Sequence, residues 1–374
     1  MVPYIIRRTI QAVPVLFLIA VVSFTLMMMA PGGPQAQFQQ NPRFSNEDVD
    51  RFLARWCLQR QPDAVGILRT FGGWIGVWNC EHGGTGLDGF FSEQGAPNFL
   101  PLSLGGGDNG LIHLDFGRSI TVSPNKPVLE LIVDRLPATL ILMFTAFLIW
   151  VSLAIVLGVI AAVRRYSVLD QAITLLSYIF YSLPTFWLGL MLIYIFAVHL
   201  RMFPSQGIVS IRDAPAPFNT ERYWAAFAEN PLPMIRDIAE HLVLPVITLV
   251  AVSVAADTRY VRSAMLDVLG QDFVRTAKAK GLPSRTVVFR HAFRNALLPI
   301  ITNVALALAF LFSGAIVTET IFTWPGMGRL YFEAILQRDY YLVMGILFVS
   351  ATLVVIMNLI ADVIYAWADP RIRY

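Results

Sequence analysis

The sequence predicts an all-α integral membrane protein with six transmembrane helices and a large extracytoplasmic loop domain after the first helix. Of its 374 residues, 56% are hydrophobic and only 14% are charged, whereas about a quarter of the residues in a soluble domain carry charge. The mean hydropathy is +0.61. A net charge of only +3 and many large apolar residues also exclude a disordered chain.

Six apolar segments have, or nearly have, the roughly 20 residues that a helix needs to cross a bilayer. They are Ile10 to Ala30, Ala138 to Val163, Ala172 to Val198, Leu242 to Ala256, Ala296 to Thr318 and Tyr340 to Ala361. The third segment contains Pro184, which should kink it. The fourth segment is short, and we expect its helix to continue as far as Leu266.

The first apolar segment has an alternative interpretation as a cleaved signal peptide, because Arg7 and Arg8 precede it. Its apolar run is longer than the roughly 7 to 15 residues of a signal core, and no A-x-A cleavage site follows. We therefore expect an uncleaved membrane anchor.

Basic residues in short loops mark the cytoplasmic side of a membrane protein. Six of them fall between Arg275 and Arg294, and Arg164 and Arg165 form another short basic loop. This density predicts that both termini and the loop at 275 to 294 are cytoplasmic.

The segment from 31 to 135 is too long for a simple connection and should form a small extracytoplasmic cap. Its Cys57 and Cys80 would lie on the oxidising side, where a disulfide is one interpretation and two buried, unpaired thiols are the other. Trp74 and Trp78 would dock a soluble partner, fill the core of the cap or lie at the membrane interface.

The composition and motifs also exclude several kinds of site. Two cysteines and five scattered histidines do not make a tetrahedral metal site, and no basic stripe indicates nucleic-acid binding. The sequence lacks G-x-x-x-x-G-K-[ST], G-x-S-x-G and H-E-x-x-H. We therefore expect no catalytic residues, no metal and no nucleotide bound by this chain.

The stretch from Asp272 to Pro299 carries the strongest functional signal. A short helix should cover Val274 to Lys280 and end at Gly281, because glycine enters a left-handed turn without steric cost. A second helix should start near Pro283 or Ser284. On physical grounds alone, a solvated basic loop that only sets topology is an equal alternative.

The pattern of Ala277, Ala279, Gly281 and Pro299 resembles the EAA loop of ABC-importer permeases, in which a coupling helix docks on the ATPase subunit. The usual acidic residue is absent, as in the peptide-type branch for dipeptides, oligopeptides and nickel. Similar motifs occur in order along the chain: Tyr4 to Arg8, Ala30 to Gly32, Asp115 to Ser119, Arg135 to Thr139, Leu183 to Gly189, Glu319 to Gly326 and Asp369 to Arg373.

This resemblance implies the type I ABC-importer fold and a division of the chain into four parts. They are an N-terminal segment with the first helix (1–30), an extracytoplasmic cap (31–135), a five-helix core (136–366) with its coupling loop at 271–295, and a cytoplasmic tail (367–374). Residues 80 to 109 look inserted relative to shorter relatives.

The resemblance also implies the partners and the site. The chain would be a multi-pass subunit of a bacterial or archaeal plasma membrane, in a heterodimer with a second homologous permease. Two ATP-binding cassette subunits would hold ATP and Mg, and a substrate-binding protein would deliver di- or oligopeptides from outside. The ATPase-coupling residues would be Arg275, Ala277, Lys278, Ala279, Lys280 and Gly281.

Polar residues within apolar spans are candidates for the translocation path. They are Tyr178, Tyr181, Ser182, Thr185 and Asn303. Such residues also bridge helices by hydrogen bonds, which is the alternative role. Asp257, Arg259, Arg262 and Asp362 lie near the inner ends of spans and are expected to pair across helices or reach the interface.

Two other classes of function compete with this assignment. An ion-coupled secondary transporter or channel would need no ATPase and would often show inverted repeats, which we do not find. A membrane-embedded enzyme would need one of the missing catalytic constellations. Within the ABC class, nickel, glutathione or another small solute is an alternative cargo.

Overall fold

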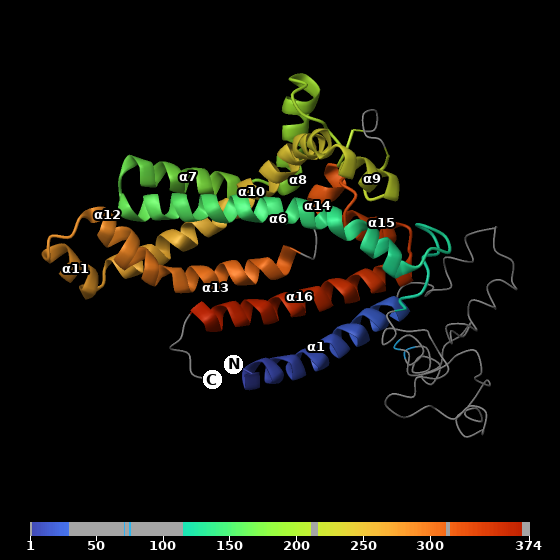
Figure 1. Ribbon diagram of the computed structural model, residues 1–374, viewed down its shortest axis with the longest axis horizontal. Helices are drawn as coiled ribbons and strands as arrows, with labels where there is room; N and C mark the ends of the chain where they lie inside the picture. Colours follow the sequence, from blue (N-terminus) through green and yellow to red (C-terminus); the bar gives the residue numbers. More distant parts are fainter. Residues whose placement is uncertain are drawn as a thin grey trace, which may run out of the picture. The chain divides into compact units, whose positions relative to one another are not determined.

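The computed structural model describes residues 2–29, 71, 75, 115–210, 216–311 and 315–368, which are helical along most of their length (Figure 1). The α-helices are α1 (Val2–Met29), α6 (Val128–Val163), α7 (Val168–Ser182), α8 (Thr185–Leu192), α9 (Glu221–Glu229), α10 (Pro231–Leu269), α11 (Asp272–Ala279), α12 (Ser284–Thr286), α13 (Arg294–Phe310), α14 (Ile316–Ile321), α15 (Met327–Leu336) and α16 (Tyr340–Ala368). Two π-helical segments, η2 (Ile193–His199) and η3 (Val287–Phe293), extend α8 and precede α13. These elements confirm the all-α class.

Within the described ranges, four helices are long and apolar enough to cross a membrane: α1, α6, α10 and α16. A fifth span results if α7 and the helix formed by α8 and η2 are counted together. These two bend by 98° at the break between Ser182 and Thr185, which confirms the kink predicted at Pro184. The segment expected from Ala296 to Thr318 falls mainly on α13, which has 17 residues. The count of six therefore remains a prediction.

The fourth predicted span is the longest helix of the described chain. It begins at Pro231, well before the expected start at Leu242, and continues to Leu269. Its 39 residues give a length of about 58 Å at 1.5 Å per residue, whereas the hydrocarbon core is about 30 Å thick. The helix therefore extends beyond the apolar layer, and it includes Pro245.

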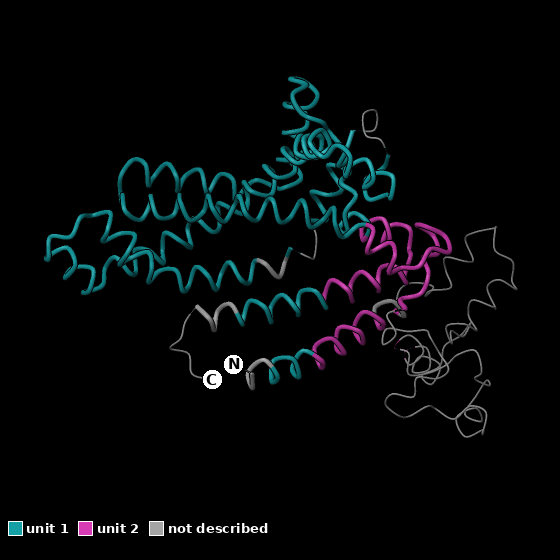
Figure 2. The backbone as a smooth tube through the Cα atoms, viewed as in Figure 1, with its two compact units in different colours: residues 1–12, 135–330, 352–374 teal, residues 13–134, 331–351 magenta. Residues whose placement is uncertain are grey.

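The chain divides into two compact units, coloured separately in Figure 2. The first unit comprises residues 1–12, 135–330 and 352–374, and the second comprises residues 13–134 and 331–351. In the first unit, α10 is the central element, because it packs against α7, α8, α13 and η3.

Close helix packing in the first unit depends on Gly158 of α6. A Cβ added there would lie 2.6 Å from the Cβ of Val261 and 2.8 Å from the backbone oxygen of Thr258, both on α10. Small residues let membrane helices approach closely where van der Waals packing drives their association. A buried apolar cluster nearer the other end of α6 includes Trp150 and Trp324.

In the second unit, the buried carboxylate of Asp339, which immediately precedes α16, binds the loop at residues 119–122. Its Oδ2 accepts hydrogen bonds from the hydroxyl of Ser119 at 2.6 Å and from the backbone N–H of Ile120 at 2.9 Å. The N–H groups of Thr121 and Val122 donate to the same oxygen. Because several donors converge on one buried charge, this carboxylate fixes the loop that follows the Asp115 to Ser119 motif.

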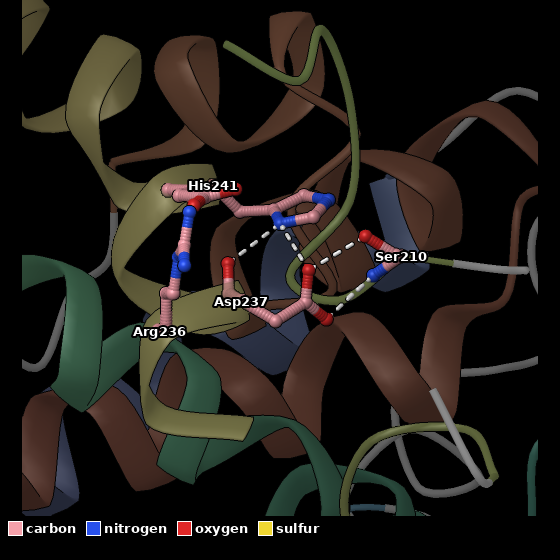
Figure 3. Close-up of polar contacts among 5 residues, drawn as sticks. Ser210, Arg236, Asp237 and His241 are labelled. Atoms are coloured by element: carbon pink, nitrogen blue, oxygen red, sulfur yellow. Dashed lines mark hydrogen bonds and ion pairs between the residues drawn. The ribbon is translucent and has the colours of Figure 1, made fainter. Parts of the chain in front are cut away.

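The connection between η2 and α10 is fastened by Asp237 in the first turns of α10. Figure 3 shows Ser210 and His241 directed at its carboxylate. The Ser210 hydroxyl and N–H donate to it at 2.6 and 2.8 Å, and Nδ1 of His241 lies 3.3 Å from Oδ1. His241 is buried, so this group anchors the connection to the helix.

Candidate functional site

The candidate site is built on α11, a two-turn helix that follows α10 after only Gly270 and Gln271. Asp272 occupies its first turn and Lys278 its last turn, the charge order that suits the helix dipole. Val274 and Ala277, three positions apart, are its buried residues. The remaining positions of the helix are exposed, so α11 is amphipathic.

The buried side of α11 belongs to an apolar cluster that joins several helices. Val274 and Ala277 share this cluster with residues of α6, α10, η3 and α13: Val159, Ala162, Val261, Met265, Val268, Val287, Ala292, Ala296 and Ile300. Protein interiors are close-packed and transmit displacement. A force applied to α11 is therefore passed to three long helices.

Gly281 ends the element as the sequence predicts. Its φ is +73°, and its N–H donates to the carbonyl oxygen of Lys278 at 3.0 Å. An added Cβ would meet no heavy atom within 4 Å, so backbone conformation rather than space favours glycine here. The chain then enters α12 at Ser284, which confirms the predicted second helix.

The outward side of this element combines positive charge with apolar surface. Arg275, Lys278, Ala279, Lys280 and Gly281 are exposed, whereas the side chain of Ala277 points into the chain's own core. Three large apolar side chains are also exposed in this part of the chain, namely Phe273, Leu282 and Phe289. Sequence reasoning missed these three, although the helical period that buries Val274 and Ala277 leaves Phe273 outside.

The residues proposed for a translocation path do not all come together. Tyr178, Tyr181, Ser182 and Thr185 flank the break between α7 and α8, and the two tyrosines are more than half exposed. The hydroxyl of Ser182 donates to the backbone oxygen of Tyr178 at 2.8 Å. Asn303 lies instead on α13, where it bridges helices.

Asn303 and Trp150 hold the carboxylate of Asp257 on α10. Nδ2 of Asn303 donates to Oδ1 at 2.9 Å, and Nε1 of Trp150 donates to Oδ2 at 3.0 Å. One carboxylate therefore joins α6, α10 and α13. This is the bridging role that the sequence analysis gave as the alternative for Asn303.

The expected pairing of the other ionisable residues is confirmed at two places. Arg262 forms a two-point ion pair with Asp170, and Arg8 contacts Asp362 at 2.8 Å. Sequence analysis did not identify Asp170, because the residue lies just before the apolar run that starts at Ala172. Its position five residues after Arg165 was the available signal.

A further buried acid, Glu319, lies on the short helix α14 outside the apolar spans. Its carboxylate accepts hydrogen bonds from the Thr139 hydroxyl at 3.0 Å and from the Arg329 N–H at 2.9 Å. Burial raises the pKa of this carboxyl above its ordinary value, against the opposing effect of these donors. The group locks the turn after α14, where Gly326 leaves room for the carboxylate.

Several predictions concern residues beyond those that the structure describes. Cys57 and Cys80, Trp74 and Trp78, and the insertion at 80–109 all lie outside the described ranges. The disulfide and the folded cap therefore stay predictions.

Comparison with known proteins agrees with the helical architecture. Residues 154–374 match the family model described as binding-protein-dependent transport system inner membrane component. The chain is 38% identical to the oligopeptide transport system permease protein AppB of Bacillus subtilis, over the whole length of both chains. It is 39% identical to the dipeptide transport system permease protein DppB of Escherichia coli over 268 residues, which cover 71% of this chain and 78% of that protein. The chain therefore belongs to the family of inner membrane components of binding-protein-dependent transport systems.

Proposed function

We propose that this chain is one permease subunit of an ATP-driven peptide importer. It pairs with a second homologous permease, two ATPase subunits that hold ATP and Mg, and a substrate-binding protein outside. The observation that carries the proposal is the exposed basic surface of α11, with exposed Phe273 on the same helix, while Val274 and Ala277 are packed into the core. The names of the relatives, which carry oligopeptides and dipeptides, support peptides as the cargo.

The packing of α11 supports a mechanism in which the chain supplies the gate and its partners supply the energy. Closure of the ATPase subunits on ATP displaces α11. Because Val274 and Ala277 are buried with residues of α6, α10 and α13, these helices move with it. The transition requires that the ATP-bound and nucleotide-free states favour different arrangements of the helices.

The proposed orientation places α11 and both termini in the cytoplasm of a bacterial or archaeal cell. The six basic residues from Arg275 to Arg294 favour this side. The contact between Arg8 near the start of α1 and Asp362 near the end of α16 also supports placing the two ends on one side. The substrate-binding protein then docks on the opposite, outer side.

Charge reversal on the outward face of α11 tests the proposal. We expect the double variant Arg275→Glu, Lys278→Glu to lose most binding of the ATPase subunits, because both side chains are exposed and the contact of Arg275 with the exposed Asp272 is long, at 3.8 Å. Arg164→Glu, Arg165→Glu is the matched control, with the same change of charge in another basic loop. Co-purification of tagged ATPase with the permease pair from detergent measures the effect.

The comparison of the two double variants shows whether α11 itself binds the ATPase or whether its basic residues only set the orientation of the chain in the membrane. If both double variants retain the ATPase equally, α11 is not the docking element. If the control loses the ATPase as completely as the α11 variant, the interaction depends on overall charge, and the assignment to α11 fails.

A further inference from the structure

Arg259 of α10 occupies an unusual environment for a charged residue in a membrane-spanning helix. Its guanidinium carbon lies over the rings of two residues of α7, at 4.8 Å from the centroid of Tyr181 and 5.1 Å from that of Tyr178. Its Nε is buried and has no hydrogen-bond partner. No carboxylate in the described part of the chain forms an ion pair with it.

The carboxylates near Arg259 on α7 and α10 already bind other groups. Asp170 binds Arg262, which lies one turn further along α10. Asp257 accepts from Trp150 and Asn303. Arg262 is neutralised by a carboxylate of the same chain. Arg259 contacts two aromatic rings instead, and these carry no negative charge.

Aromatic contacts leave a guanidinium able to bind an anion. A ring attracts the cation through its face, whereas the five N–H donors of arginine point outward in the guanidinium plane and match a carboxylate in a two-point contact. The tyrosine rings thus hold the side chain without occupying its donors. Nε has no acceptor and is buried in the single chain, so an incoming carboxylate would meet the two Nη groups.

The two tyrosines that contact Arg259 lie at the surface of the single chain. Tyr178 is 52% exposed and Tyr181 is 55% exposed in the single chain. Charged residues in membrane helices face a water-filled cavity or another protein surface rather than lipid. The position also adjoins the 98° break between α7 and α8, and interrupted helices of this kind accompany binding sites in other transporters.

We propose that Arg259, held by Tyr178 and Tyr181, binds the carboxylate of a peptide as it crosses the membrane. The C-terminal carboxylate is the ligand group that every unmodified peptide carries. This inference rests on the proposed function, because it assumes that the path carries peptides. It adds to that function a site within the permease that distinguishes a free acid from its amide.

The test uses the complete transporter, with its partner permease, ATPase subunits and binding protein, in lipid vesicles. Uptake is measured for a labelled tripeptide and for its C-terminal amide, a pair selected for equal loading of the binding protein. We expect the wild type to take up the acid at least about tenfold faster than the amide, which is the lower end of the effect of a hydrogen bond to a charged group. In Arg259→Gln, this ratio should fall to near one while ATP hydrolysis persists.

Conservative variants separate contact with substrate from a structural role. Tyr178→Phe and Tyr181→Phe keep the aromatic faces and should retain the acid preference. Arg259→Lys keeps the charge but lacks the planar donors and should restore only part of it. An unchanged acid-to-amide ratio in Arg259→Gln overturns the proposal.

Two other outcomes have different meanings. If Arg259→Gln cannot be recovered with the partner permease and Arg259→Lys can, the positive charge at this position is needed for pairing with that subunit, and the proposal is overturned. If the wild-type complex takes up neither peptide but does take up another solute delivered by its binding protein, peptides are not the cargo. The proposed peptide-carboxylate site at Arg259 is then also rejected.

Discussion

Asp170 and Arg262 join α7 to α10 through two parallel hydrogen bonds, Oδ1 with Nε at 2.7 Å and Oδ2 with Nη2 at 2.8 Å. The Asp170 side chain is almost fully buried. It also accepts the N–H of Tyr166 at 2.9 Å, so one carboxylate holds the connection after α6, the start of α7 and the C-terminal part of α10. Movement of α10 is thereby passed to α7.

Removal of this carboxylate should destabilise the chain strongly. We expect Asp170→Ala to cost about 3–5 kcal/mol, because it leaves a partly buried guanidinium unpaired. The reciprocal exchange Asp170→Arg, Arg262→Asp should recover part of the loss. Thermal unfolding of the detergent-purified complex measures both effects. A melting temperature unchanged in Asp170→Ala would refute the structural role of the pair.

Gly158→Ala tests the close contact of α6 with α10. The added Cβ would lie 2.6 Å from the Cβ of Val261, so the two helices must separate, at a cost of about 1–3 kcal/mol. Gly270→Ala is the matched control, because its Cβ would approach only the backbone oxygens of Leu266 and Asp267, at 3.7 and 3.8 Å. Equal thermal stability of the two variants would contradict the account.

The buried carboxylate of Glu319 should tolerate an amide but not an apolar side chain. Glu319→Leu removes the acceptor for the fully buried Thr139 hydroxyl, and an unsatisfied buried donor costs about 1–3 kcal/mol. Glu319→Gln keeps the size of the side chain and one acceptor oxygen, so its loss should be smaller. The thermal stability of the two variants in detergent gives the comparison, and the reverse order would contradict the network.

Substitutions of Gly281 test whether the backbone conformation that ends α11 is needed for coupling. Gly281→Ala should cost roughly 1–2 kcal/mol, because φ is +73° and a Cβ disfavours the left-handed region. Gly281→Pro is incompatible with that φ and removes the N–H that bonds Lys278. We expect graded loss of transport and of ATPase binding, with proline the more severe. Intact transport and assembly in Gly281→Pro would eliminate α11 as the coupling element.

The sequence predicted the features that depend on local chemistry. Apolar length predicted the long helices α1, α6, α10 and α16. Pro184 predicted the break and Gly281 predicted the turn that ends α11, because each acts through its own backbone. The sequence did not show that Ala277 faces the core or that Asp170 binds Arg262. These contacts join residues on different helices, and their partners are set by tertiary packing rather than by spacing in the chain.

Helix lengths differ from the apolar segments for a related reason. Hydropathy identifies the segment that is apolar enough for a bilayer, whereas α10 begins earlier, at Pro231. The first turns of α10 are stabilised by the hydrogen bond from Ser210 to Asp237. A hydrogen-bonded helix continues beyond the apolar layer as long as its residues can form it. Polar positions such as Arg236 and Asp237 therefore belong to the helix without belonging to the apolar segment.

The central claim is that this chain is a gate whose energy comes from partner ATPase subunits. The most direct measurement is peptide uptake into lipid vesicles that contain the permease pair and the binding protein, with and without the ATPase subunits and ATP. We expect accumulation against a gradient only when the ATPase subunits and ATP are both present. Accumulation by the permease pair without them, driven by an ion gradient, would contradict the account.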